Sequence, residues 1–393
     1  MGTTADELVR EATARAGSDN LGDDWFRTPL ELFVADLGDA PLSDGGRRFM
    51  TEQAIRDLVR RIEVLDFLDR HPEIDEVQLP PIVYVTGQVR SGSTLLHNLL
   101  ACHELGRPIL RWELMQPLPP PEAATYATDP RIASTQAAID KRRGTMLEQM
   151  HWVNADEPEE CKWGFIDFVS ILGGSAGAVM RRWSAFVDEA DMTPVFANYR
   201  RVLKLLLWKN PPPDGGFLVL KAPQVATAIG EFAEVFPEAR FVLTARDPYR
   251  VIVSGCTMLD DILSALVDRE RFGSEQLAPI ATESVERSVA AVLAYVESAD
   301  TPPLVLPYPS VVGHPVSTTI AAYAELGLPA DDGLGARIEG FLSRQREGLR
   351  AAPPARLPDW GLDHDEVLSR PVLAEFCARF GVEPERRRLT GAT

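Results

Sequence analysis

Residues 81–100, PIVYVTGQVRSGSTLLHNLL, decide the fold. An apolar strand at residues 82–85 leads into a loop with two glycines, and residues 95–100 have the pattern of a helix. The phosphate-cradling pattern G-x-x-x-x-G-K-[ST] fits at Gly87, Gly92 and Thr94, but Ser93 stands where the lysine belongs. Triphosphatases need that lysine on the β- and γ-phosphates, so its replacement argues against ATP or GTP as a phosphoryl donor. The loop still suits an anion, because the N–H groups of the following helix point at it.

A second strand and helix begin in the stretch ARFVLTARDPYRVIVSGCTM, residues 239–258. An apolar strand at residues 241–244 is followed by Arg246 and then by a helical pattern that carries Ser254. Both side chains can converge on one phosphate, the arginine as a bidentate fork and the serine as a neutral donor. The alternative is a salt bridge between Arg246 and Asp247, with Pro248 opening the helix.

The two segments together resemble the sulfotransferases that use 3'-phosphoadenosine-5'-phosphosulfate (PAPS). In that family a basic residue followed by Ser-Gly-Thr-Thr, or a close variant, wraps the 5'-phosphate. The matching positions here are Arg90, Ser91, Gly92, Ser93 and Thr94. The family holds the 3'-phosphate with an arginine and with a serine eight residues later, which correspond to Arg246 and Ser254. Segments 112–114, 155–160, 220–223 and 361–363 look like the bacterial branch, so the resemblance covers roughly residues 25–381.

The fold expected from the strand pattern is a three-layer, P-loop-like α/β fold with a mainly parallel central sheet. Apolar runs at residues 82–85, 217–220, 241–244 and 304–306 are separated by helical segments. Residues 1–80 are predicted to form a helical cover, disordered or loosely helical up to residue 20, with an amphipathic helix at 52–70. Residues 81–393 are predicted to form the sulfotransferase α/β domain. Within it, residues 112–209 are predicted to be a mostly helical insertion that builds the acceptor pocket, with a strand signal only at 165–172.

Composition excludes several classes of partner. The 393 residues carry a formal net charge of −18, which disfavours nucleic acid and anionic membranes. The positive charge that an anionic donor needs must therefore be local. Neither a basic start with an apolar core nor a membrane-length apolar run occurs, which makes a cytoplasmic protein the default. The four cysteines lie far apart without histidines at ligand spacing, so we expect no metal, while a homo-oligomer is not excluded.

Sulfuryl transfer needs an in-line acceptor oxygen, a base for its proton, and cations near the leaving phosphate. The resemblance implies that Arg90 neutralises the leaving bisphosphate and that Lys221 contacts the sulfuryl group. A plain surface lysine is the alternative for Lys221. Many relatives carry a histidine a few residues after that lysine, but residues 223–225 here read Pro-Gln-Val.

The predicted base is therefore Glu113. It follows a likely strand at residues 109–112, where several sulfotransferases without a histidine base place a glutamate. A carboxylate there accepts a proton if burial raises its pKa. His151, just before the acidic residues 156–160, is the second candidate, and His103 is the third.

Two other readings compete with a sulfotransferase. Residues 173–177, GGSAG, match a nucleophile elbow around Ser175, which makes a serine hydrolase the first alternative. Its acid and base would be Asp260 or Asp261 with His314 or His364. The second alternative is a non-catalytic protein that binds PAPS or its product PAP. The acceptor expected is a small hydroxylated molecule, and the aromatic-rich insertion either lines a pocket for it or packs the insertion's own core. Its aromatic residues are Trp152, Trp163, Phe165, Phe168, Trp183, Phe186, Phe196, Tyr199 and Trp208.

Overall fold

A parallel sheet forms the centre of the protein. The computed structural model describes residues 3–141, 154–167, 176–329, 331–349 and 360–385. The strands are β1 (Ile82–Thr86), β2 (Gly106–Pro108), β3 (Phe217–Lys221), β4 (Ala239–Ala245) and β5 (Leu304–Pro307). They lie in the order β2-β3-β1-β4-β5, and every neighbouring pair is parallel. The predicted fold class and the four predicted strands are thereby confirmed.

Side chains alternate between the two faces of the sheet, and each face has its own core. Val83 and Val85 of β1 face one core, while Ile82 and Tyr84 face the other, and the whole strand is buried. Burial on both faces explains why the strands appear as nearly continuous apolar runs in the sequence.

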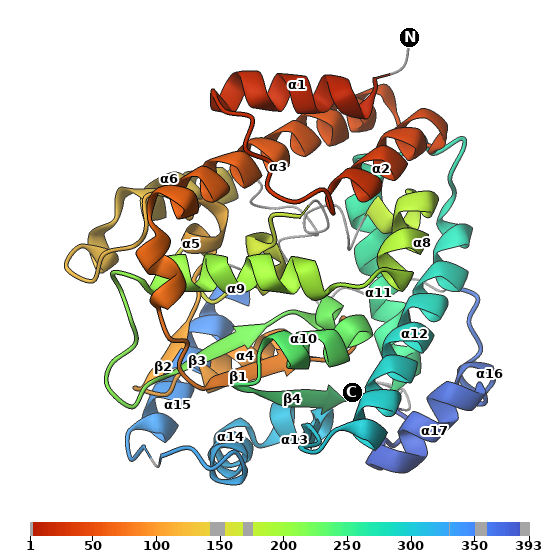
Figure 1. The fold of residues 1–393 in the computed structure, drawn as a ribbon. Helices are drawn as coiled ribbons and strands as arrows, with labels where there is room; N and C mark the ends of the chain where they lie inside the picture. Colours follow the sequence, from red (N-terminus) through yellow and green to blue (C-terminus); the bar gives the residue numbers. More distant parts are fainter. Residues whose placement is uncertain (1–2, 142–153, 168–175, 330, 350–359, 386–393) are drawn as a thin grey trace.

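Helices cover both faces and complete three layers (Figure 1). The core around Val83 includes residues of α4 (Ser93–Leu100), α13 (Tyr308–Gly313), α14 (Pro315–Glu325) and α15 (Leu334–Leu349). The core around Tyr84 includes residues of η5 (Pro223–Ala228), α9 (Thr193–Leu207), α10 (Ile229–Val235), α11 (Pro248–Ser264) and α12 (Leu277–Ser298). The short η6 (Ser274–Gln276) precedes α12, and α16 (His364–Leu368) and α17 (Pro371–Phe380) follow at the C-terminal end.

The residues before β1 are helical, as expected. They form α1 (Ala5–Ala16), α2 (Arg27–Asp39), α3 (Asp44–Arg70) and η1 (Pro72–Glu76). The three α-helices lie at the top of Figure 1. The first helix is better ordered than predicted, because Thr4 and Glu7 form a capping box and Leu8 is buried. The predicted amphipathic helix is the second half of α3, which begins earlier than expected because the Ser43 side chain caps it.

The segment predicted as an insertion is mostly helical where it is described. Its elements are α5 (Arg111–Met115), η2 (Tyr126–Thr128), α6 (Pro130–Asp140), η3 (Cys161–Gly164), η4 (Ala176–Ala178), α8 (Arg181–Glu189) and α9. The strand predicted at residues 109–112 is wrong, since β2 ends at Pro108 and α5 begins at Arg111. The Glu113 carboxylate accepts the Leu110 N–H and so starts a helix where the apolar pattern was too short to exclude one. Residues 165–167 are irregular, and the rest of that predicted strand lies outside the described residues.

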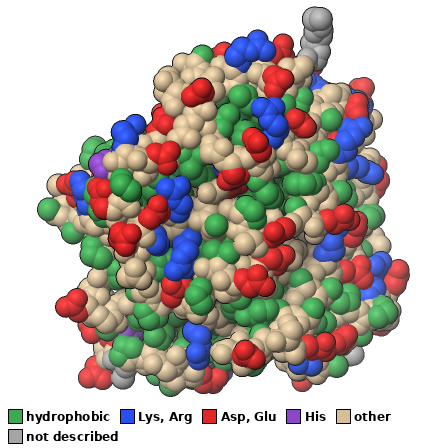
Figure 2. Space-filling model, viewed as in Figure 1, with side chains coloured by type: hydrophobic (Ala, Val, Ile, Leu, Met, Phe, Trp, Pro, Cys, Tyr) green, Lys and Arg blue, Asp and Glu red, His purple; other side chains and the backbone are tan. Residues whose placement is uncertain are grey.

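The surface carries both signs of charge. On the face that Figure 2 shows, basic side chains are interspersed among acidic and apolar ones. Within the described ranges, no helix is both long and apolar enough to cross a membrane.

Candidate active site

Four chain segments meet where the parallel strands end, because the carboxyl ends of parallel strands lie at one edge of a sheet. The loop after β1 starts at Gly87, and Lys221 is the last residue of β3. Arg246 follows β4 directly, and Tyr308 follows β5. Ligand sites in open α/β sheets lie at this edge, so these residues define the candidate site.

The loop after β1 is built to hold an anion. Gly87 and Gly92 have positive φ angles of 119° and 97°. A Cβ atom at Gly92 would lie 2.7 Å from two ring atoms of Tyr308, so only glycine fits there. α4 begins at Ser93, directly after Gly92, and its first N–H groups open onto the loop. Ser91 is buried, and its Oγ lies 2.7 Å from Thr244 Oγ1, which ties the loop to β4.

Both sequence-predicted phosphate segments come together at Arg90. Its Nε donates to Ser254 Oγ at 3.0 Å, and its backbone oxygen accepts from an Arg246 guanidinium nitrogen at 2.9 Å. Arg90 is not a glycine, yet its φ is 72°, a conformation that costs free energy and that the surrounding contacts must hold. Burial, and then the charge of Arg246, lower the pKa of Arg90. Such a pair of crowded guanidinium groups favours an anion between them.

Arg246 does not pair with the next residue, as the salt-bridge alternative requires. Asp247 instead accepts the Tyr249 N–H at 2.9 Å and so caps α11. The Arg246 guanidinium lies 4.0 Å from the centre of the Tyr308 ring and binds the Glu385 carboxylate at 2.9 Å. The side chain thus faces the site, and its carboxylate partner comes from the C-terminal end of the chain.

Lys221 is a buried lysine within the site, which excludes the surface alternative. Its side chain is 1% exposed, and its Nζ donates to Thr94 Oγ1 at 3.2 Å and to Glu160 Oε1 at 2.8 Å. The other oxygen of Glu160 lies 2.8 Å from Lys162 Nζ. The Glu160 carboxylate therefore lies between the ammonium groups of Lys221 and Lys162. Lys221 also contacts Thr94, so this carboxylate is next to the loop after β1, called the phosphate loop below.

The acidic segment reaches this point by pairing with the residues around α5. Leu110 forms a β-bridge with Pro158, and the Arg111 N–H donates to the Glu157 carbonyl at 3.0 Å. Glu159 is buried and pairs with Arg111. The chain then turns Glu160 toward Lys221. Sequence reasoning did not single out Glu160, since a run of acidic residues usually indicates a solvated surface.

Comparisons with known proteins bear out the family resemblance seen in the sequence. A family model described as "Sulfotransferase family" matches residues 81–332. The chain belongs to the sulfotransferase family. Its structure is similar to the crystal structure of sulfotransferase STF9 from Mycobacterium avium, with 25% identity, a TM-score of 0.86, and 98% of each chain covered. Sulfotransferase STF1 from Mycobacterium tuberculosis H37Rv shares the fold, with 22% identity, a TM-score of 0.80, and coverage of 95% of this chain and 99% of that one. Comparison with curated proteins gave no match.

The base predicted for this sulfotransferase, Glu113, lies in a network of its own. Its carboxylate accepts two hydrogen bonds from Arg107, at 2.6 and 3.0 Å, and one each from the Leu110 N–H and the Tyr126 hydroxyl, both at 2.8 Å. Glu113 is fully buried, and burial followed by the Glu113 charge raises the pKa of Tyr126. Both carboxylate oxygens are therefore committed to holding α5 and η2 together.

The histidine candidates lie elsewhere. His151 is outside the described residues. His103 uses both ring nitrogens on the backbone, since Nδ1 accepts the Leu105 N–H at 3.1 Å and Nε2 lies 3.1 Å from the Pro329 carbonyl. A ring with both nitrogens bonded has no lone pair left for a substrate proton.

Two of the residues named for the hydrolase alternative have other partners. Ser175 lies outside the described residues. Asp260 pairs with Arg269 at 2.9 Å, and His364 contacts Asp247 at 3.3 Å. Within the described ranges, no group of three His, Cys, Asp or Glu side chains could hold a metal ion.

Proposed function

We propose that this sulfotransferase transfers the sulfuryl group of PAPS to a hydroxyl of a small-molecule acceptor. The observation that carries the proposal is the direct connection between Arg90, Ser254 and Arg246 beside a phosphate loop without the triphosphatase lysine. A donor with two separate phosphate groups matches two cationic positions, whereas a linear triphosphate does not. The cytoplasmic location expected from the sequence remains part of this proposal.

The donor would lie along the edge of the sheet. The N–H groups at the start of α4, with Ser91, Ser93 and Thr94, suit the 5'-phosphate, and Arg90 adds positive charge there. Arg246 and Ser254 suit the 3'-phosphate. Support for a nucleotide between these points comes from the Tyr308 ring, which packs against Gly92 and lies beneath Arg246.

The reaction is a displacement at sulfur. The acceptor oxygen attacks the sulfur as its proton leaves, and the bond from sulfur to the 5'-phosphate oxygen breaks, which releases PAP. Negative charge then grows on the bridging oxygen, where Arg90 and the Lys221 ammonium stabilise it. Most of the acceleration is expected from positioning and from these fixed charges.

We further propose Glu160, in place of Glu113, as the base that takes the acceptor proton. Its carboxylate is 2.8 Å from Lys221 Nζ, and Lys221 also contacts the phosphate-loop residue Thr94. The proton would thus be accepted next to the group that stabilises the leaving phosphate. The four hydrogen bonds to Glu113 support a positioning role for that residue.

A small hydroxylated acceptor fits the surroundings of Glu160. The charged groups of Lys162 and Arg111 lie 5.3 and 5.6 Å from the centre of the Trp163 ring. This aromatic ring beside the base offers a surface on which a flat or apolar acceptor can stack. By contrast, Phe165 packs edge-on against Phe196 and belongs to the core of the insertion.

Calorimetry with PAP and with adenosine 5'-monophosphate tests the donor assignment. PAP should bind more tightly, and Arg246→Ala should weaken PAP by roughly 2–3 kcal/mol, the range for hydrogen bonds to charged groups. Arg240→Ala, at the start of the same strand, is the matched control and should bind PAP like the wild type. Equal affinities for the two nucleotides refute the 3'-phosphate site.

The acceptor is found by mass spectrometry. The protein with PAPS is offered panels of phenols, sterols, lipids and sugars, and a sulfated product identifies the class. Donor binding without transfer to any acceptor, even one from cell extracts, favours the non-catalytic alternative.

A further inference from the structure

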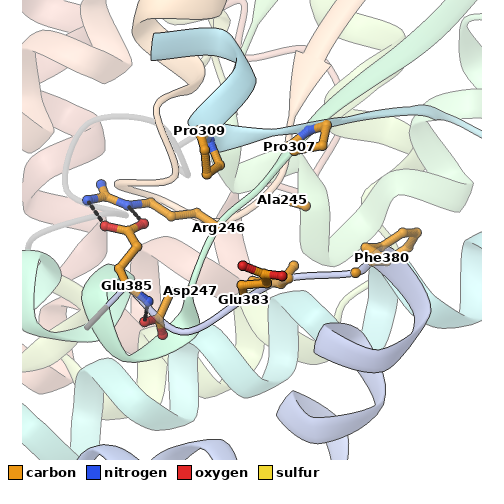
Figure 3. Close-up of a pocket in the computed structure, with 10 residues that line it drawn as sticks. Ala245, Arg246, Asp247, Pro307, Pro309, Phe380, Glu383 and Glu385 are labelled. Atoms are coloured by element: carbon orange, nitrogen blue, oxygen red, sulfur yellow. Dashed lines mark hydrogen bonds and ion pairs between the residues drawn. The ribbon is translucent and has the colours of Figure 1, made fainter. Parts of the chain in front are cut away.

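The carboxylate of Glu385 binds Arg246, the arginine assigned to the 3'-phosphate. Glu385 binds Arg246 through both oxygens, with Oε1 at 2.9 Å from Nε and Oε2 at 3.2 Å from a terminal guanidinium nitrogen (Figure 3). Oε2 also lies 3.7 Å from Arg250 Nε. This is the fork geometry by which arginine holds a carboxylate or a phosphate oxygen pair.

The main chain brings Glu385 to this place. α17 ends at Phe380, Gly381 adopts the left-handed conformation after it, and the chain then runs past Glu383 toward Asp247 (Figure 3). The Glu385 N–H donates to Asp247 Oδ2 at 2.7 Å, next to the arginine that its side chain binds. A cavity of about 150 Å³ lies between this segment and the ends of β4 and β5, lined among others by Ala245, Pro307 and Phe380.

The ion pair between Arg246 and Glu385 is bidentate, and solvent still reaches both side chains. Both side chains are partly shielded, with Arg246 18% and Glu385 25% exposed. Arg246 binds Glu385 through one edge of its guanidinium group. That edge can bind either this carboxylate or a phosphate, but not both at once. A phosphate dianion carries more charge than the carboxylate and has three oxygens for Arg246, Arg250 and Ser254.

We propose that Glu385 sets the affinity of the donor site for the 3'-phosphate by acting as a built-in competitor for Arg246. The inference rests on the proposed function of Arg246 as the 3'-phosphate ligand. A nucleotide with a 3'-phosphate displaces the Glu385 side chain, whereas a nucleotide without one leaves the pair intact. The apparent dissociation constant for PAP equals the intrinsic one divided by the fraction of molecules in which the pair is open. The same competition assists the release of PAP after transfer.

Glu385→Gln tests the proposal, because it removes the charge while it keeps the side-chain size and the N–H that binds Asp247. If the pair is closed in about nine-tenths of molecules, PAP should bind about tenfold more tightly to the variant. Adenosine 5'-monophosphate should bind both proteins equally. Glu383→Gln removes the same charge from the lining of the same cavity, leaves the Arg246 pair in place, and should match the wild type.

A second comparison separates displacement from a general effect of charge. In an Arg246→Ala background, Glu385→Gln should give no further gain, because the competitor has lost its target. A tenfold gain that persists without Arg246, or that Glu383→Gln reproduces, overturns the proposal. Equal PAP affinity of wild type and Glu385→Gln also overturns it and leaves the donor site standing. Failure of both proteins to bind PAP refutes the donor assignment and this inference with it.

Discussion

Replacement of Glu113 and of Glu160 by glutamine should separate a structural carboxylate from a catalytic one. Both side chains are buried glutamates in the same region of the fold, and both bind cations. Only Glu160 is bonded to Lys221, which contacts the phosphate loop. The two substitutions make the same chemical change, so each serves as the control for the other.

The cost of Glu113→Gln follows from its four hydrogen bonds. Glutamine keeps one acceptor oxygen and turns an NH₂ group toward donors, and Arg107, whose side chain is only 10% exposed, loses its counter-charge. Loss of one partner of a buried pair costs about 3–5 kcal/mol. Because the amide oxygen still accepts some of these bonds, we expect the free energy of unfolding to fall by roughly 2–3 kcal/mol. Turnover of the folded variant should stay within about threefold of the wild type.

Glu160→Gln should behave differently. It should bind PAP while kcat at saturating PAPS falls by roughly 10²–10⁴-fold, the usual contribution of a general base. Urea unfolding and initial rates of sulfated product, both at one temperature where the variants are folded, provide the two readouts. Wild-type unfolding of Glu113→Gln combined with a hundredfold loss of kcat would show that Glu113 is the base and that the reasoning is wrong.

Three further predictions concern the phosphate loop and its supports. Burial, and then the charge of Lys221, lower the pKa of His97 from 6.5 to about 4, so below pH 6.5 the unfolded chain binds a proton that the folded chain does not. His97 should therefore raise the free energy of unfolding of the wild type by about 2 kcal/mol from pH 4.5 to pH 7, as measured by urea titration. In His97→Gln this His97 contribution to the rise should be missing. Gly92→Ala should lower the free energy of unfolding by roughly 1–3 kcal/mol, since its Cβ would meet the Tyr308 ring at a φ of 97°, and an unchanged midpoint contradicts this packing. Lys221→Met should reduce kcat on the order of 10²-fold with PAP affinity nearly unchanged, and an undiminished rate removes Lys221 from the chemistry.

Much of the fold was predictable because its strands are buried on both faces. Residues 82–85 and 217–220 gave clear apolar runs, and their burial in the parallel sheet explains the signal. Residues 109–112 gave a similar signal but serve as the start of a helix, and only the capping contact of Glu113 distinguishes the two. A run of four residues, one of them the charged Arg111, carries too little periodicity to decide.

The sequence predicted the site residues that directly follow a strand. It did not predict the site residues that come from segments distant in the sequence. Arg90 and Arg246 stand at fixed offsets from strands, so the sequence pattern places them. Glu160 and Glu385 arrive from segments with no such offset, and each resembles an ordinary surface glutamate in the sequence. Their role depends on long-range pairing, with Lys221 and with Arg246 respectively, which no local pattern records.

The contact between Lys221 and Thr94 sets the loop of this chain apart from that of the triphosphatases. In the nucleotide-binding loop pattern, the hydroxyl at the Thr94 position is the one that coordinates Mg²⁺. Here that hydroxyl accepts a hydrogen bond from the Lys221 ammonium 3.2 Å away, a cation that belongs to the neighbouring strand β3. The loop shares most of its sequence pattern with the triphosphatase loop, while the positive charge beside Thr94 is encoded on another strand.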